Sequence, residues 1–166
     1  MKRLLATFVL VFPFAAFGAD SIPDSAFYKN AAEGGISEVE LGNLAQKKSN
    51  NESVKDFGAM MVKDHTAAND KLKDIAASKN ISLPTSASMG QMATKAKLEV
   101  LSGDTFDKSY IKGMIKDHEE DIALFKKEIA SGQDPDAKAF GSATLPTLRM
   151  HLKKIKAIAA DAGITK

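Results

Sequence analysis

The sequence predicts an all-α protein, a four-helix bundle with a long connection between its second and third helices. Four long segments carry apolar residues at steps of three and four, the spacing that gives a helix one apolar stripe. Runs of turn-forming residues separate these segments. A weak internal repeat also relates the two halves of the chain. At 166 residues, the chain has the length of one domain.

The first 18 residues have the features of a secretory signal peptide. Lys2 and Arg3 precede an apolar run over residues 4–17, which is shorter than the roughly 20 residues of a membrane-spanning helix. Small residues at Ala16 and Gly18 predict cleavage after Gly18, with an uncleaved membrane anchor as the alternative. We therefore expect residues 19–166 to form one exported domain in the periplasm.

The charge balance argues against a nucleic-acid partner. Removal of residues 1–18 takes away two basic residues and no acidic one, so the 23 basic residues become 21, against 21 acidic residues. Nucleic-acid-binding domains usually carry a basic face, and the sequence shows none. No later segment is long and apolar enough to cross a membrane. We expect a protein or a cell-envelope component as any partner. Cys is absent, which excludes disulfides and thiolate metal ligands.

The first helix is predicted over residues 26–48, with Asp24 or Ser25 as its N-cap. Three glycines lie within it, although glycine is unfavourable inside a helix. They indicate the close approach of a neighbouring helix, with a break at Gly34–Gly35 as the alternative. The three glycines are Gly34, Gly35 and Gly42.

The second helix shows the clearest apolar stripe and is predicted over residues 53–79, with Asn80 as its stop signal. Residues 81–104 then form a long connection, and its apolar spacing predicts a short extra helix over about 89–101. Antiparallel neighbours need only a few connecting residues. A connection of this length suits a crossover that runs the length of a bundle.

The third helix is predicted over residues 105–130, with Asp104 as its cap, and the fourth over residues 136–162. Pro146 lies inside the fourth helix and lacks the backbone N–H that a helix interior uses. We therefore expect a kink there, or a restart of the helix with Thr144 as its cap.

The internal repeat relates the second helix to the fourth. Val54–Gly58 resembles Ala137–Gly141, and both segments reach an isoleucine, Ile81 or Ile164, 24 residues after their phenylalanine. The first and third helices then correspond as well, because each leads through a short turn into its partner. Two helical hairpins joined by a long crossover make up the ferritin-like arrangement.

Each of the four predicted long helices carries a polar residue on its apolar face, near the middle of the helix. A Met-x-Lys-Asp-His phrase occurs at residues 61–65 and 114–118, and its histidines, His65 and His118, lie on apolar stripes. His151 is placed in the same way on the fourth helix, and Glu38 on the first. Mid-helix positions of antiparallel helices of similar length meet at one height. The pattern predicts one carboxylate and three imidazoles in the same slice of the core.

Further carboxylates flank these histidines. Asp121 follows His118 by three residues and shares its helical face, so it is either a direct ligand or a residue that orients an imidazole. Asp64 and Asp117 directly precede their histidines and point about 100° away, so we rank them lower.

Three imidazoles and a carboxylate suit Zn, Fe, Cu or another first-row metal. The alternative is a hydrogen-bonded set of core histidines without a metal. A di-iron carboxylate centre needs Glu-x-x-His on two helices, and this chain has no acidic residue three positions before any of its histidines. Met61 and Met114 each lie four residues before a histidine and could add thioether ligands for copper, although core filling explains them better. The predicted metal residues are Glu38, His65, His118, Asp121 and His151.

Four phrases of the sequence resemble the DUF4142 family of exported bacterial proteins, often labelled as membrane proteins. They are AAEGGISEVELGNLAQKKS, VKDFGAMMVKDH, IKGMIKDHEEDIALFKKE and TLPTLRMHL. The resemblance implies a ferritin-like helical bundle and brings no established activity. It also implies that the family's characteristic polar positions are Glu38, His65, His118 and His151.

Two functions remain open from the sequence. One is a periplasmic bundle that binds a transition metal for metal handling or envelope stress. The other is a non-enzymatic envelope interaction module whose core cluster is structural. An oxidoreductase would need an open coordination position that the sequence does not reveal. The sequence contains no recognisable catalytic nucleophile, phosphate loop or standard catalytic motif, so we do not expect an enzyme.

Overall fold

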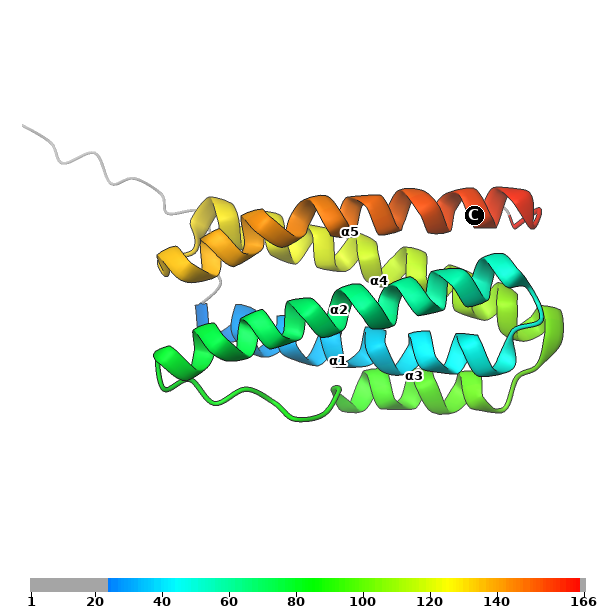
Figure 1. Cartoon of the computed structure of the whole chain (residues 1–166), viewed down its shortest axis with the longest axis horizontal. Helices are drawn as coiled ribbons and strands as arrows, with labels where there is room; N and C mark the ends of the chain where they lie inside the picture. The colour runs from blue at the N-terminus through cyan, green and yellow to red at the C-terminus, as the bar shows by residue number, and fades with distance from the viewer. Residues whose placement is uncertain (1–23, 165–166) are drawn as a thin grey trace, which may run out of the picture.

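The computed structural model describes residues 24–164, which form five helices and no strand. The predicted all-α class is confirmed. The four long helices run side by side, and the short α3 lies against α1 (Figure 1). None of the described helices has the length and hydropathy of a membrane span. The predicted signal peptide, residues 1–18, lies outside the described residues. The helices are α1 (Asp24–Lys48), α2 (Glu52–Ser78), α3 (Met89–Glu99), α4 (Gly103–Ser131) and α5 (Pro135–Asp161).

Helices α1 and α2 form a hairpin in which small residues let the two backbones approach closely. A Cβ atom on Gly42 would lie only 2.6 Å from the carbonyl oxygen of Gly58. A Cβ atom on Gly35 would overlap the side chain of Asn69. The predicted close approach is thus confirmed for Gly35 and Gly42, and α1 runs through Gly34–Gly35 without a break.

Helices α4 and α5 form a second hairpin that corresponds to the first at an offset of 83 residues, the separation of Phe57 and Phe140. The same offset relates Phe27 to Tyr110. The ring centroids of Phe27 and Phe140 lie 6.3 Å apart, and those of Tyr110 and Phe57 lie 6.4 Å apart. The second helix of each hairpin therefore packs against the first helix of the other hairpin. An aromatic pair lies at each of these two equivalent contacts.

The chain between the hairpins returns along α1 and includes α3 (Figure 1). The Ser88 hydroxyl accepts from the Gln91 N–H at 3.3 Å, and the Gln91 side chain accepts from the Ser88 N–H at 2.9 Å, which caps the start of α3. The Lys95 ammonium lies 3.0 Å from the Glu40 carboxylate and so ties α3 to α1.

Helix α5 continues unbroken from Pro135 to Asp161, so the predicted restart with Thr144 as a cap is wrong. The cap is Asp134, whose carboxylate accepts from the Asp136 N–H at 2.9 Å. Pro146 has no N–H to donate to the Ser142 carbonyl one turn earlier, so this carbonyl lacks its helical hydrogen bond. Both residues are exposed. Water can reach that carbonyl, which lowers the cost of the proline.

Two other predicted caps are also wrong, because their helices begin earlier than the sequence indicates. Asp24 and Ser25 lie inside α1, and the Asp24 carboxylate accepts from the Gln133 N–H at 2.8 Å. Helix α4 begins at Gly103, whose φ of 54° is a conformation that glycine adopts readily. Asp104 consequently lies in the first turn of α4.

The apolar core consists of two clusters separated by a polar layer. On each long helix, at least one buried polar residue lies between residues of one cluster and residues of the other. The first cluster includes Leu41, Phe57, Met61, Phe106, Tyr110, Met114 and Ile155. The second includes Phe27, Tyr28, Leu72, Ile122, Phe125, Phe140 and Leu148. The residues of the polar layer are Glu38, His65, His118 and His151, with Ser37 next to Glu38 on α1.

Candidate metal centre

Three histidines from three helices converge in the polar layer and form what we call the His cluster: His65 of α2, His118 of α4 and His151 of α5. Their side chains are buried, with exposed fractions of 6%, 0% and 0%. One ring nitrogen of each lies within 4.8 Å of one ring nitrogen of the other two. The structure therefore brings together three of the five residues predicted as metal ligands.

The tautomer of His118 follows from its hydrogen bond to the backbone. Its Nδ1 atom lies 2.9 Å from the carbonyl oxygen of Met114, one helical turn earlier. A carbonyl oxygen can only accept, so Nδ1 carries the proton and donates it. In the neutral ring, Nε2 then holds a lone pair that points into the His cluster.

The tautomer of His151 is fixed from the opposite side of its ring. Its Nε2 atom lies 3.0 Å from the Asp64 carboxylate of α2 and donates to it. The lone pair of His151 is consequently on Nδ1. This Nδ1 lies 3.4 Å from Nε2 of His118. Two lone pairs thus face each other, and a neutral pair of rings has no proton to place between them.

His65 adds a third unsatisfied ring to this arrangement. Among the described residues, its Nε2 atom has no hydrogen-bond partner and is buried. Its ring centroid lies 5.8 Å from that of His118 and 5.4 Å from that of His151. A buried polar atom without a partner is uncommon in native proteins and calls for a ligand or a functional explanation.

The surroundings of the His cluster keep the imidazoles neutral. Burial lowers the pKa of His65 to about 3, with smaller contributions from His118 and His151. Burial also lowers the pKa of His118 to about 4. Phe57 adds to this apolar wall, because its ring centroid lies 6.2 Å from that of His118 and 6.3 Å from that of His151. Neutral imidazole is the form that binds metal ions.

Glu38 and Asp121, the two predicted carboxylate ligands, lie to the side of the His cluster. Glu38 is buried, and its Oε1 atom lies 3.5 Å from Nδ1 of His118, the nitrogen that faces away from the other histidines. Asp121 lines a separate small cavity with Glu38, Gly34 and Ser37 of α1. Neither carboxylate belongs to the group whose ligand atoms converge.

Asp64 is the functional candidate that the sequence underrated. It points away from the apolar stripe of α2, and for that reason it ranked below Asp121. The direction that takes it away from His65 brings it to His151 on α5. A carboxylate bonded to the outer nitrogen of an imidazole is the usual support of a metal-ligating histidine. A helical wheel of one helix cannot reveal such a contact with another helix.

Met61 and Met114, considered as thioether ligands, are buried in the first apolar cluster. Neither residue lines the cavity that reaches the His cluster. Their placement supports the core-filling interpretation.

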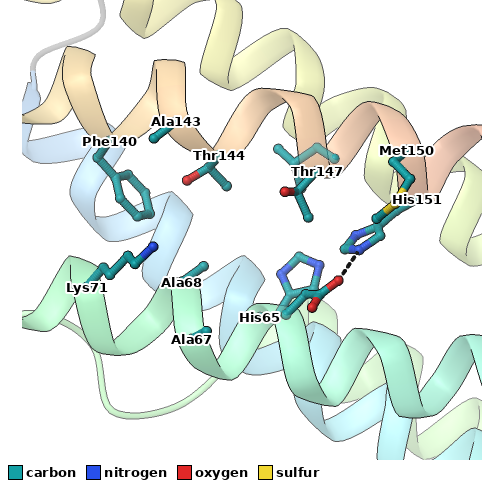
Figure 2. Close-up of a pocket in the computed structure, with 12 residues that line it drawn as sticks. His65, Ala67, Ala68, Lys71, Phe140, Ala143, Thr144, Thr147, Met150 and His151 are labelled. Carbon is teal, nitrogen blue, oxygen red and sulfur yellow. Dashed lines mark hydrogen bonds and ion pairs between the residues drawn. The ribbon is translucent and has the colours of Figure 1, made fainter.

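A cavity of about 240 Å³ opens between α2 and α5 and reaches the His cluster. His65 and His151 lie at one end of it, and Thr144 and Thr147 of α5 face α2 across it (Figure 2). Met150, with an exposed fraction of 47%, lies at its edge. The His cluster is therefore buried and still open to solvent on one side.

Several solved structures share the fold. A DUF305 protein from Streptomyces coelicolor is 13% identical, with a TM-score of 0.73 over 87% of this chain and 96% of its own. A DUF305 fragment from Deinococcus radiodurans is 11% identical, with a TM-score of 0.74 over 85% and 98%. CopM in its Cu(II)-bound form is 13% identical, with a TM-score of 0.72 over 85% and 98%.

At these identities the similarity establishes the fold alone. No curated protein was similar enough in sequence to match the chain. The family model for DUF4142, a domain of unknown function, matches residues 12–158 and confirms the resemblance seen in the sequence. The chain therefore belongs to the DUF4142 family.

Proposed function

We propose that this protein is an exported, ferritin-like bundle that binds one first-row transition metal ion through His65, His118 and His151. The observation that carries the proposal is the 3.4 Å separation of His118 Nε2 and His151 Nδ1, two atoms that both hold lone pairs. A proton or a cation between them turns this repulsive contact into an attractive one. The lowered pKa values of the rings favour a metal cation over a proton.

The spacing of these two nitrogens suits a tetrahedral metal ion. Two imidazole nitrogens that each lie about 2.0–2.1 Å from one tetrahedral metal are roughly 3.3 Å apart. The observed 3.4 Å agrees with this value. His65 supplies the third ligand, and the cavity between α2 and α5 leaves room for a water or another small ligand at a fourth position. The backbone carbonyl of Met114 accepts from the outer nitrogen of His118, and the Asp64 carboxylate accepts from that of His151, so both rings are held in position.

A set of three neutral imidazoles favours Cu(II) or Zn(II) over the harder Mg²⁺ and Ca²⁺. Fe(II) is less suited, because non-haem iron sites usually include a carboxylate ligand and Glu38 faces the outer nitrogen of His118. The similarity in fold to CopM, solved in a Cu(II)-bound form, adds support for copper.

The role that we propose is metal handling in the cell envelope, as a buffer or a store. A site buried inside a bundle and reached through a cavity between α2 and α5 suits retention of an ion. The predicted signal peptide supports export, and the Streptomyces coelicolor protein of the same fold is described as secreted. Two hairpins joined by a long crossover support the ferritin-like assignment.

Metal analysis of protein purified without an affinity tag tests the proposal. We expect about one Cu or Zn per chain, taken up again by the apo protein, and loss of that uptake in His118→Ala. Met61→Leu is the matched control, since it changes another buried side chain of the same core and should retain the metal. If the wild-type apo protein takes up no stoichiometric metal, the histidines are structural and the interaction-module alternative replaces this proposal.

A further inference from the structure

A second polar cavity lies on the side of His118 that faces away from the other two histidines. It lies between α1 and α4 and beneath α3. It measures about 50 Å³, which is room for an ion together with a few water molecules. Its walls come from three helices, and four of its lining residues are acidic. The lining residues are Gly34, Ser37, Glu38, Gln91, Asp117, Glu120 and Asp121. We call it the acidic cavity.

The deepest carboxylate of the acidic cavity lacks a partner on one side. Glu38 has an exposed fraction of 2%, and its Oε2 atom has no hydrogen-bond partner among the described residues. Its other oxygen, Oε1, lies 3.5 Å from Nδ1 of His118. An unpaired buried carboxylate costs several kcal/mol unless it takes up a proton or binds a cation.

One lysine pairs with a lining residue of the acidic cavity. Lys116 lies 3.0 Å from Glu120, at the exposed rim. Among residues 24–164, no ion pair joins Asp117 or Asp121 to a lysine or an arginine. The protein therefore gathers three inner carboxylates, Glu38, Asp117 and Asp121, and no lysine or arginine of the described residues forms an ion pair with any of them.

Electrostatics show how unfavourable this gathering is without a cation. Glu38, Asp117 and Asp121 line one small cavity, so their negative charges repel one another. Burial raises the pKa of Asp121 to about 7, and the charge of Asp117 raises it further. A divalent ion in the cavity would offset this repulsion.

We propose that the acidic cavity is a binding site for one hard divalent cation, such as Mn²⁺ or Ca²⁺, held by Glu38, Asp117 and Asp121. Carboxylate oxygens are the ligands that these ions prefer. The Ser37 hydroxyl offers a further oxygen. Gln91 forms a wall, because its carbonyl oxygen already accepts from the Ser88 N–H.

The acidic cavity differs from the His cluster in its ligands and therefore in its metal. One site has nitrogen donors only, and the other has oxygen donors only, so the two should select different ions. Glu38 belongs to the acidic cavity and also meets the His cluster, since its side chain lines the cavity and its Oε1 atom lies 3.5 Å from Nδ1 of His118. The location also gives α3 a function, because this helix covers the seam of α1 and α4 and contributes Gln91.

Calorimetric titration of Mn²⁺ and Ca²⁺ into the purified exported protein tests the site. We expect saturable binding of at least one of these ions, and Asp121→Asn should weaken it at least about tenfold. Asp117→Asn is the second variant, in case the first fails to fold. Asp74→Asn, on the exposed face of α2, is the matched control and should bind like the wild type.

The two sites can be tested apart. His65→Ala should lose Cu or Zn uptake and keep Mn²⁺ or Ca²⁺ binding, whereas Asp121→Asn should do the reverse. The proposal is overturned if neither ion binds the wild type at millimolar concentration. It is also overturned if folded Asp121→Asn and Asp117→Asn both bind these ions as tightly as the wild type does.

Discussion

The Asp64 carboxylate of α2 lies 3.0 Å from Nε2 of His151 on α5, so each hairpin supplies one member of this pair. The contact fixes which nitrogen of His151 faces the His cluster. It also means that the metal-binding geometry depends on the packing of the two hairpins against each other.

Asp64→Ala should therefore weaken metal binding although Asp64 itself is no ligand. We expect a loss of about 10- to 100-fold in affinity, the usual effect of removing the hydrogen-bond partner of a ligating histidine. Asp64→Asn should lose less, because its amide oxygen can still accept from Nε2. Competition titration against a chelator of known affinity measures this, with Asp56→Asn on the same helix as control. Equal affinities for wild type and Asp64→Ala would show that the contact does not support the site.

Metal affinity should stay nearly constant from pH 7.5 down to about pH 5.5. The pKa values of His65 and His118, about 3 and about 4, leave both rings unprotonated over this range, so protons do not compete with the metal. A short peptide with one histidine should begin to lose metal near its pKa of about 6.5. Chelator competition at several pH values makes the comparison. A steep loss of affinity between pH 7 and pH 6 in the protein would contradict the buried, neutral state of the rings.

The same shifts predict how the apo protein responds to acid. A histidine whose folded pKa lies below its unfolded value destabilises the fold as the pH falls below about 6.5, because only the unfolded chain takes up the proton. Bound metal should oppose this loss, and denaturant unfolding at pH 5 with and without metal shows whether it does.

Glu128 at the end of α4 should respond to pH in the opposite direction. It is fully buried, and burial together with the neighbouring Asp24 raises its pKa from 4.5 to about 7. The fold favours the protonated form of Glu128. The contribution of Glu128 to the stability of the protein is therefore fully present below pH 4.5 and is lost as the pH rises through 7. Glu128→Gln should therefore be more stable than the wild type by about 2 kcal/mol at pH 8 and similar to it at pH 4.5.

Urea unfolding at the two pH values measures this difference, with Glu52→Gln on the exposed start of α2 as control. A Glu128→Gln variant that is less stable than the wild type at pH 8 would show that the charged carboxylate has a stabilising partner.

Gly42→Ala should destabilise the α1–α2 hairpin, whereas Gly113→Ala should not. A Cβ atom on Gly42 would meet the backbone of Gly58 at 2.6 Å, and a backbone atom cannot move aside as a side-chain tip can. A Cβ atom on Gly113 would meet nothing within 4 Å. We expect a loss of about 1–3 kcal/mol for the first and a gain of about 0.5–1 kcal/mol for the second. Thermal unfolding compares them, and equal melting temperatures would contradict the close approach.

Much of the fold could be predicted from the sequence, because amphipathic helices and their turns are local signals. The stripes of α2 and α4 identified His65 and His118 as inward residues, and both are buried. Pro146 misled the prediction for α5, since its cost depends on whether the Ser142 carbonyl is exposed, and that is a property of the packed bundle.

The candidate site was harder to predict than the helices. A helical wheel gives the face on which a side chain lies, but it does not say which neighbour that face meets. Asp121 shares a face with His118 and still lines a different cavity, whereas Asp64 lies off its own stripe and reaches His151. The division of the predicted cluster into a His cluster and an acidic cavity depends on such contacts between helices.

X-ray absorption spectroscopy of the metal-loaded protein tests the central claim most directly, because it counts the ligands of the bound ion. With Cu(II) or Zn(II), we predict about three imidazole nitrogens at roughly 2.0 Å, with any remaining ligand a light atom such as the oxygen of water. In His118→Ala, the imidazole count should fall. A first shell of carboxylate oxygens without imidazole scattering, or no stoichiometric metal to examine, would contradict the account.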